Sequence, residues 1–279
     1  MGIFDGCLLA CDVDGTLTEN GYINPKNKEK IEFFEKEGGR FVIATGRGVA
    51  ALGPVIEKIP DISISVVANG CIIYDYKKQE ILYDKEIIKK EFLYAQKICE
   101  LCPTVGVEIH SGASAYTLKR NIATTLHQEY EKFVGEDVDY EFVSNLKWNK
   151  VIYIFESAED REMVKAELEK DKTECSFINT CAVINGEMQY YLEQVPGDVS
   201  KAKGLNELCK ILDINSEKLF AIGDYYNDLE MLSLANISAV PFSSPDDVKQ
   251  YADYLTCSCD DGAVADFINY LTSKFSAVD

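Results

Sequence analysis

Two aspartates near the start of the chain, Asp12 and Asp14, follow a short apolar run in the segment Asp12-Val13-Asp14-Gly15-Thr16-Leu17-Thr18. A carboxylate is ionised at neutral pH, so Asp12 can attack phosphorus without a base and form an aspartyl-phosphate. Asp14 can protonate the departing oxygen and later activate the water that hydrolyses this intermediate. Gly15 permits the tight turn that directs Asp14 towards the same substrate. A cap or turn acid would explain Asp12 alone, but not the whole run through Thr18.

A second pair of acids, Asp224 and Asp228, follows the apolar run Leu219-Phe220-Ala221-Ile222. Mg²⁺ prefers oxygen ligands, usually a few carboxylates together with waters and substrate phosphate. The candidate ligands are Asp12, Asp224 and the main-chain carbonyl of Asp14. Asp228, one helical turn later, would orient water or these ligands from behind. A helix N-cap would require one acid of the pair but not both, so the spacing favours a cation site.

Donors for a phosphoryl group are present in two further segments. Thr45 and the backbone amide of Gly46 follow the apolar run 41–44, where a hydroxyl and an amide can hold a phosphoryl oxygen. Lys201 can neutralise both the phosphate and the crowded carboxylates, which could not all stay ionised without positive charge nearby. Lys203 competes for this role, and we favour Lys201.

The elements that must position these residues alternate between strand and helix patterns. Asn24 and Pro25 are suited to cap and begin the first helix. The buried strands are expected at 7–11, 41–44 and 64–68, and the helices between and after them at 25–37 and 49–58. This order predicts an α/β fold with a doubly wound parallel sheet, in which ligands bind at the carboxyl ends of the strands.

The pattern changes from about residue 84, where half-apolar strands begin. The elements expected there are helices at 87–102 and 158–170 and strands at 105–109, 115–118, 151–155 and 190–192. Alternation resumes after Pro196-Gly197, with a helix at 202–211, a strand at 219–222, a helix at 228–234, a strand at 237–240 and a helix at 262–273. We therefore predict a core of residues 1–83 and 194–279, and an α+β insert of residues 84–193 on short connections, as a hinged lid requires.

Composition narrows the class of protein. A formal net charge of -19 argues against a nucleic-acid surface, which needs a basic stripe. No apolar run is long enough to cross a bilayer, and the first residues lack the basic start and cleavage site of a signal peptide, so we expect a cytoplasmic protein without a membrane partner. Ten cysteines in 279 residues are too few for a disulfide scaffold, and zinc or redox use is less favoured than incidental thiols. The sequence predicts no oligomeric state.

The motifs together resemble those of the haloacid dehalogenase (HAD) superfamily, and specifically of its Cof-type hydrolases. The DxDGTL motif of that family is similar to Asp12–Leu17, its strand-ending Thr to Ala44-Thr45-Gly46-Arg47, its lysine to Lys201, and its GDxxND motif to Gly223–Asp228. Asn69-Gly70 and the segment Asp260–Ala265 resemble the Cof branch as well. The likeness covers both core segments, and the insert matches by position and length as a C2-type cap that selects the substrate.

The resemblance implies a role for each site residue. Asp12 would be the nucleophile and Asp14 the general acid and base. Thr45, Gly46, Lys201 and Asn227 would contact phosphate or hold the phosphate loop. Asp12, Asp14 and Asp224 would bind Mg²⁺, with Asp228 supporting them.

The expected function is a Mg²⁺-dependent phosphatase that hydrolyses small phosphorylated metabolites, such as sugar phosphates or cofactor phosphates, through an aspartyl-phosphate. A phosphomutase of the phosphomannomutase type would use the same aspartate but return the phosphate to a sugar. A catalytically silent phosphate-binding protein is the third possibility, although Asp14 and Asp228 are both present. Arg47, His110 and Tyr225 receive no defined role at this point.

Overall fold

The computed structural model of the protein describes residues 2–59 and 62–276, which form two compact units. The first unit consists of the residues up to Gly46, of residues 53–82 and of those from Ser200 onward. The second unit consists of residues 47–52 and 83–199. The expected insert 84–193 thus lies within the second unit, and its role as a substrate-selecting cap stays a prediction.

The first unit is built on a sheet that has eight strands among the described residues, in the order β16-β15-β14-β1-β4-β5-β6-β7. Its strands run parallel from β16 to β5, and β6 pairs antiparallel with β5. The predicted α/β fold with a parallel sheet is therefore confirmed, with an antiparallel extension at one edge. The strands are β1 (Leu8–Cys11), β4 (Arg40–Ala44), β5 (Ile64–Val67), β6 (Ile72–Asp75), β7 (Glu80–Asp84), β14 (Leu219–Ile222), β15 (Ile237–Pro241) and β16 (Tyr254–Thr256); β2 (Thr18–Glu19) and β3 (Tyr22–Ile23) form a separate small hairpin.

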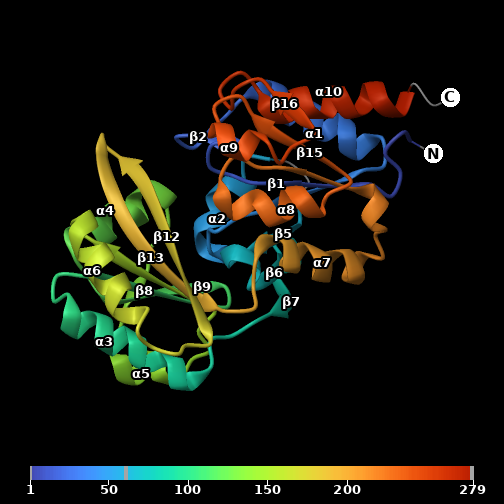
Figure 1. Ribbon diagram of the computed structural model, residues 1–279. Helices are drawn as coiled ribbons and strands as arrows, with labels where there is room; N and C mark the ends of the chain where they lie inside the picture. The colour runs from blue at the N-terminus through green and yellow to red at the C-terminus, as the bar shows by residue number, and fades with distance from the viewer. Residues whose placement is uncertain (1, 60–61, 277–279) are drawn as a thin grey trace. The chain divides into compact units, whose positions relative to one another are not determined.

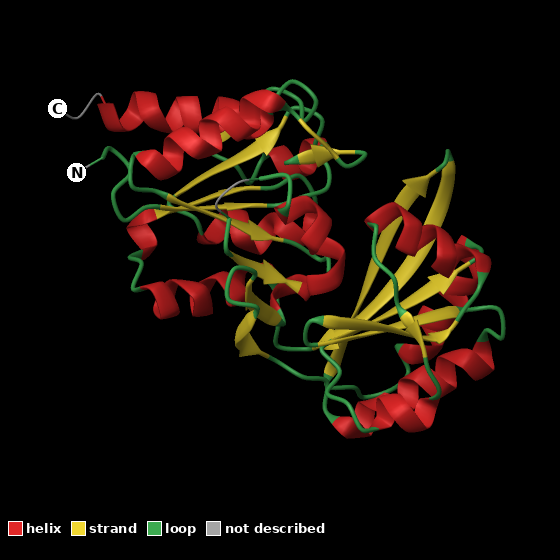
Figure 2. Ribbon diagram, turned by 180° about the vertical axis from the view of Figure 1, so that it is seen from behind, coloured by secondary structure: helices red, strands yellow, loops and turns green. Residues whose placement is uncertain are grey.

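Helices cover both faces of this sheet, as a doubly wound sheet requires. In Figure 1, α1 and α10 lie together on one side of the sheet and α7 and α8 on the other, and Figure 2 shows the same layers from behind. The helices are α1 (Pro25–Lys36), α2 (Val49–Ile56), α7 (Lys201–Leu212), α8 (Leu229–Leu234), α9 (Asp246–Lys249) and α10 (Ala263–Ser276). None of the helices in the described ranges combines the length and the apolar character that a bilayer crossing demands.

The helix starts follow local side-chain chemistry. The Asn24 side chain accepts a hydrogen bond from the backbone N–H of Lys26, and Pro25 occupies the first turn of α1, as the sequence predicts. The Ser200 side chain accepts from the N–H of Lys203 and caps α7. This cap sets the first residue of α7 at Lys201.

The second unit contains a sheet that has six strands among its described residues, in the order β10-β9-β8-β11-β13-β12. One face packs an apolar cluster that includes the fully buried Trp148 against α3, α5 and α6, and α4 packs on the other face through Ala123. The strands are β8 (Gly106–Ser111), β9 (Ser114–Lys119), β10 (Glu136–Asp137), β11 (Lys150–Phe155), β12 (Cys175–Ile184) and β13 (Glu187–Pro196); the helices are α3 (Leu93–Leu101), α4 (Ile122–Glu131), α5 (Tyr140–Ser144) and α6 (Ala158–Leu168).

The predicted start of the first helix of the insert is wrong. A helix was expected from Ile87 to Cys102, but α3 begins at Leu93 after a 3₁₀ turn at Lys89–Phe92. Ile87 instead forms a β-bridge with Trp148, and its N–H donates to the Trp148 carbonyl at 2.6 Å. This tertiary pairing outweighs the helical periodicity of the segment.

Replacing glycine by alanine should have opposite effects on stability at two helical positions, Gly204 and Gly53. A Cβ at Gly204 of α7 would lie 2.5 Å from Cγ1 of Val66 and 2.8 Å from Cα of Gly70, so Gly204→Ala forces α7 away from the sheet. We expect a loss of about 1–3 kcal/mol in the free energy of unfolding, measured by urea denaturation. The control is Gly53→Ala in α2, where a Cβ meets no described atom within 4 Å and the gain in helix propensity stabilises by about 0.5–1 kcal/mol. Equal effects at both sites would contradict the close approach of α7.

Candidate active site

The parallel register of the central strands brings three loop segments to one edge of the sheet. Cys11 of β1 lies opposite Ile222 of β14 on one side and Ile43 of β4 on the other. The residues that follow these strands therefore emerge together at their carboxyl ends. The backbone N–H of Asp12 continues the pairing by donating to the Ile222 carbonyl at 3.0 Å.

Lys201 joins the acidic segments. Its Nζ donates to Oδ1 of Asp12 at 2.5 Å and to Oδ1 of Asp228 at 2.7 Å. Lys201 is 1% exposed and Asp12 6% exposed, so the contacts lie in a medium of low dielectric constant. Burial alone would lower the pKa of Lys201, but the carboxylates of Asp12 and Asp228 outweigh burial and hold the pKa above its ordinary value. Lys201 therefore stays charged.

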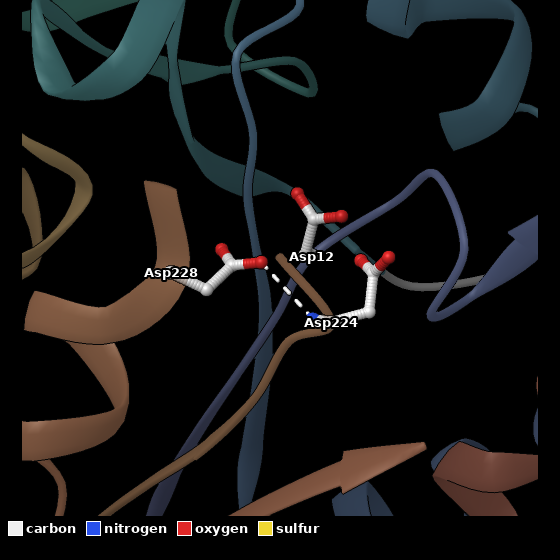
Figure 3. Close-up of side chains that lie close together, drawn as sticks. All are labelled: Asp12, Asp224 and Asp228. Atoms are coloured by element: carbon white, nitrogen blue, oxygen red, sulfur yellow. Dashed lines mark hydrogen bonds between the residues drawn. The ribbon is translucent and has the colours of Figure 1, made fainter. Parts of the chain in front are cut away.

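Asp228 has both carboxylate oxygens engaged by protein groups. Oδ1 accepts from Lys201, and Oδ2 accepts from the backbone N–H groups of Asp224 at 3.1 Å and Tyr225 at 3.2 Å. Figure 3 shows the bond from the Asp228 carboxylate to the Asp224 amide. These bonds hold the turn after β14 in shape, so they favour a supporting role for Asp228 over direct metal ligation.

Asp12, Asp224 and Asp228 form a carboxylate cluster in which one oxygen of each lies within 4.8 Å of the others. Figure 3 shows the Asp12 carboxylate beside those of Asp224 and Asp228, which both come from the turn after β14. Burial raises the pKa of Asp224 to about 7, and the charge of Asp228 adds to this effect. Burial likewise raises the pKa of Asp12, against the opposing charge of Lys201. The single ammonium group thus leaves excess negative charge in the cluster, and an added cation would relieve it.

Gly15 lets the loop after Asp12 approach Asp224 closely. Gly15 has a φ of 83°, which an L side chain rarely adopts, and a Cβ there would lie 2.4 Å from Oδ2 of Asp224. Next to it, the hydroxyl of Thr16 donates to Oδ1 of Asp224 at 3.0 Å. Sequence reasoning gave Thr16 no role, although its place two residues after Asp14 in a strand-end loop was a usable signal.

Thr45 and Gly46 follow β4 and are held by β5 and the turn after it. The Thr45 N–H donates to the Val66 carbonyl at 2.9 Å, and its carbonyl accepts from the Asn69 N–H at 3.0 Å. A Cβ at Gly46 would lie 3.1 Å from Oδ1 of Asn69, so this asparagine lines the segment. Thr45 is buried at 2% exposure, which fixes its position at the strand end.

The remaining predicted residues lie at the surface of the first unit. Asp14 is exposed, and its role as general acid and base stays a prediction. Lys203 is exposed and Lys201 is buried against the carboxylates, so the structure separates the two lysines. Asn227 is exposed on the 3₁₀ turn Tyr226–Asp228, and among the described residues it makes no hydrogen bond to the carboxylate cluster. Its proposed phosphate contact stays a prediction.

The chain belongs to the haloacid dehalogenase-like hydrolase family, whose model matches residues 9–268. Phosphatase YwpJ of Bacillus subtilis is 24% identical over 286 residues, covering 95% of this chain and 99% of the relative. The 5-amino-6-(5-phospho-D-ribitylamino)uracil phosphatase YcsE of the same organism is 24% identical over 264 residues, covering 94% of each chain. The resemblance stated from the motifs is confirmed, and so is the prediction of an enzyme of this hydrolase class.

Solved structures agree on the fold. A haloacid dehalogenase-like hydrolase from Bacteroides thetaiotaomicron superposes with a TM-score of 0.81 at 22% identity, covering 95% of this chain and 99% of its own. A sugar phosphatase of subclass IIB of the family superposes with a TM-score of 0.79, also at 22% identity, with the same coverage. The α/β architecture with an inserted α+β unit is therefore shared.

Excess negative charge in the cluster predicts stabilisation by Mg²⁺. A ligand that binds only the folded state at about 100 times its Kd adds about 2.7 kcal/mol to the free energy of unfolding. We expect such a gain for the unaltered chain in thermal unfolding with Mg²⁺ against chelator, and little or none for Asp224→Asn. Asp246→Asn removes a fully exposed acid elsewhere in the unit and should keep the gain. The same Mg²⁺ response in all three proteins would rule out the cluster as the binding site.

Proposed function

We propose that the protein is a Mg²⁺-dependent phosphatase of small phosphorylated metabolites. The observation that carries the proposal is the contact of Lys201 with Asp12, because it places a positive charge beside a buried carboxylate at the end of the central strand. The relatives named as phosphatases, one acting on a phosphorylated ribitylaminouracil, support the reaction class. A similar solved structure is a sugar phosphatase, which supports a small phosphorylated metabolite as the substrate.

The donor set fits Mg²⁺. The cluster offers only oxygen ligands, which this cation prefers, and excess negative charge that one lysine does not balance. Asp12 and Asp224 would hold the ion together with the main-chain carbonyl of Asp14, while Asp228 is committed to Lys201 and to backbone amides. A bound Mg²⁺ would supply positive charge for the phosphoryl oxygens.

In the first step we assign the attack on phosphorus to a carboxylate oxygen of Asp12. The bond between phosphorus and the alcohol oxygen breaks, and a proton from the Asp14 carboxyl goes to that oxygen. Lys201, Thr45 and the amide of Gly46 would balance the charge of the phosphoryl oxygens. In the second step water attacks the aspartyl-phosphate, Asp14 takes its proton, and the bond from phosphorus to Asp12 breaks to release phosphate.

A release screen over many phosphate monoesters tests the nucleophile. We expect phosphate release that needs Mg²⁺ and falls to background in Asp12→Asn, because an amide cannot attack phosphorus. The matched control is Asp75→Asn, a buried aspartate of β6 at 3% exposure that caps a turn and pairs with Lys78, and it should retain activity. Activity that survives in Asp12→Asn or in chelator would defeat the proposal. Isomerised sugar phosphate without free phosphate would instead establish a mutase, and binding without turnover a silent phosphate-binding protein.

The proposed acid role of Asp14 depends on the leaving group. Removing a general acid costs about 10²–10⁴-fold in rate when the departing oxygen needs a proton. Asp14→Asn should therefore slow the first turnover of an alkyl phosphate strongly, but that of p-nitrophenyl phosphate much less, since p-nitrophenolate leaves without protonation. Rapid-quench measurement of alcohol release compares the two. Equal losses on both substrates would contradict a role as the acid.

A further inference from the structure

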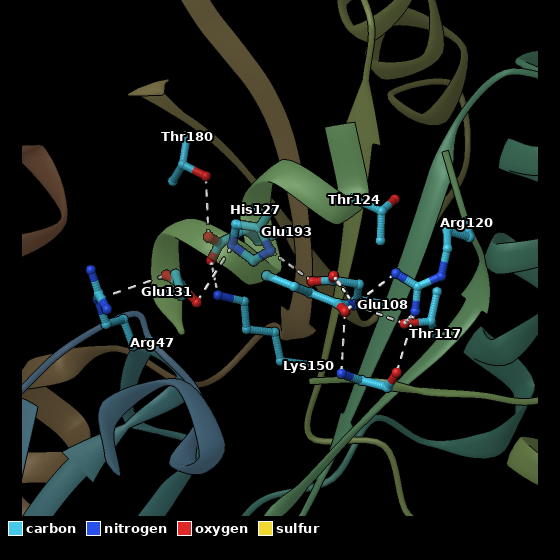
Figure 4. A network of polar contacts seen from close by, with 12 residues as sticks. Arg47, Glu108, Thr117, Arg120, Thr124, His127, Glu131, Lys150, Thr180 and Glu193 are labelled. Atoms are coloured by element: carbon cyan, nitrogen blue, oxygen red, sulfur yellow. Dashed lines mark hydrogen bonds and ion pairs between the residues drawn. The ribbon is translucent and has the colours of Figure 1, made fainter. Parts of the chain in front are cut away.

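Buried side chains of alternating charge form a row on the polar face of the sheet in the second unit. Nδ1 of His127 lies 2.8 Å from Oε2 of Glu108, and Nε2 of His127 lies 3.5 Å from Oε2 of Glu131. Oε1 of Glu131 lies 3.7 Å from Nε of Arg47. Figure 4 shows this charge row, Glu108–His127–Glu131–Arg47, running from β8 through α4 to Arg47.

The row is desolvated along its whole length. The side chains of Glu108, His127, Glu131 and Arg47 are 1%, 6%, 13% and 7% exposed. Burial favours a neutral imidazole, but the two flanking carboxylates outweigh it and raise the pKa of His127 to about 10. Burial also acts against an ionised Glu131, and the charges of His127 and Arg47 outweigh it, so the pKa of Glu131 is lowered. His127 is therefore held as a cation between two carboxylates, and the carboxylate of Glu131 lies between His127 and Arg47.

Arg47 is the first of six residues that pack with the second unit although the first unit surrounds them in the chain. Residues 47–52 group with 83–199, whereas Gly46 and Gly53 belong to the first unit. The guanidinium of Arg47 lies over the ring of Tyr130, 5.9 Å from its centre. Ala51 packs with Ala115 and Phe133. The first turn of α2 is thus anchored in the second unit.

Gly48 shows how close this packing is. A Cβ at Gly48 would lie 2.1 Å from Nδ1 of His110, so the histidine occupies the space that a side chain would take. His110 is 2% exposed, and burial lowers its pKa to about 4, which makes it neutral. A backbone segment packed this tightly transmits a displacement of Arg47 to its neighbours instead of absorbing it.

The chain connects this anchor directly to the phosphate-binding segment proposed above, because Gly46 and Arg47 share a peptide bond. We propose that Glu131, held by His127, whose other ring nitrogen contacts Glu108, is a positioning residue: it fixes Arg47 and, through that peptide bond, the placement of Thr45 and Gly46. The inference rests on the proposed function for the identity of those phosphate contacts. The competing explanation is that the charge row only holds α4 on the sheet, in which case it would affect folding alone.

Kinetic constants separate the two explanations. Glu131→Gln keeps the size of the side chain but removes its charge, and Arg47→Gln removes the charge at the other end of the contact while leaving a shorter polar side chain. For both variants we expect KM for p-nitrophenyl phosphate and Ki for inorganic phosphate to rise about tenfold or more, since a misplacement of about 1 Å costs up to about a hundredfold. A purely structural role would lower only the amount of active protein, and so kcat per total protein, with KM and Ki unchanged.

A double-mutant cycle tests whether the two residues act as one unit. The double variant Arg47→Gln with Glu131→Gln should be no worse than the more impaired single variant, because the same contact is lost once. Arg47→Lys keeps the charge and should show a smaller rise in KM than Arg47→Gln. If Glu131→Gln does not fold, Glu131→Asp and Arg47→Gln carry the same comparison.

The matched control is Glu91→Gln in the same unit. Glu91 is 4% exposed and accepts a hydrogen bond from Thr173, with no partner in the charge row. It should lose stability but keep KM and Ki. Unchanged KM and Ki in Glu131→Gln, or multiplied effects in the double variant, would overturn the inference. Lack of phosphate release by the unaltered chain, or full activity in Asp12→Asn, would instead mean that the proposed function is wrong.

Discussion

Asp12 and Asp228 share one ammonium group, that of Lys201, and all three side chains are buried. Carboxylates so close together in a low dielectric medium would otherwise repel each other and take up protons. The contact can form only if the end of β1, the start of α7 and the turn after β14 meet at one edge of the sheet. The parallel register brings the end of β1 and the turn after β14 to the same edge. Gly204 approaches Gly70 closely, which needs glycine at both positions, and this contact packs α7 against the sheet.

Most of this arrangement could be predicted from the sequence, because it depends on where apolar runs end. An apolar run that ends in an acid marks the carboxyl end of a buried strand, and parallel strands share that edge. Asp12 and Asp224 were found in this way, and Thr45 as a hydroxyl at the end of a third apolar run; the structure places them after β1, β14 and β4. The choice of Lys201 over Lys203 needed one more fact, that Ser200 caps α7 and leaves the first of the two lysines buried.

The second unit was less predictable for physical reasons. No helix was predicted over α4, and the residues that α4 buries include the polar Thr124, His127 and Gln128. Their polar groups are satisfied by partners such as Glu108 and Thr117, which a local pattern cannot reveal. The predicted helix start at Ile87 was wrong for the same reason, because the pairing of Ile87 with Trp148 joins residues far apart in the sequence. Local rules work where the chain itself sets the geometry, and they fail where a distant partner does.

The division of α2 between the two units has a consequence for exchange of parts within the family. A segment cut at residues 83 and 199 would leave behind the residues 47–52, which pack with the second unit. Ala115 and Phe133 would then lose the apolar partner that Ala51 provides, and Glu131 the guanidinium that faces it. A graft of this insert onto a related core would need that core to carry a compatible first turn of α2. The segment that must be exchanged together is therefore larger than residues 83–199, because it includes residues 47–52. Recombination at residues 83 and 199 would separate residues that pack on each other.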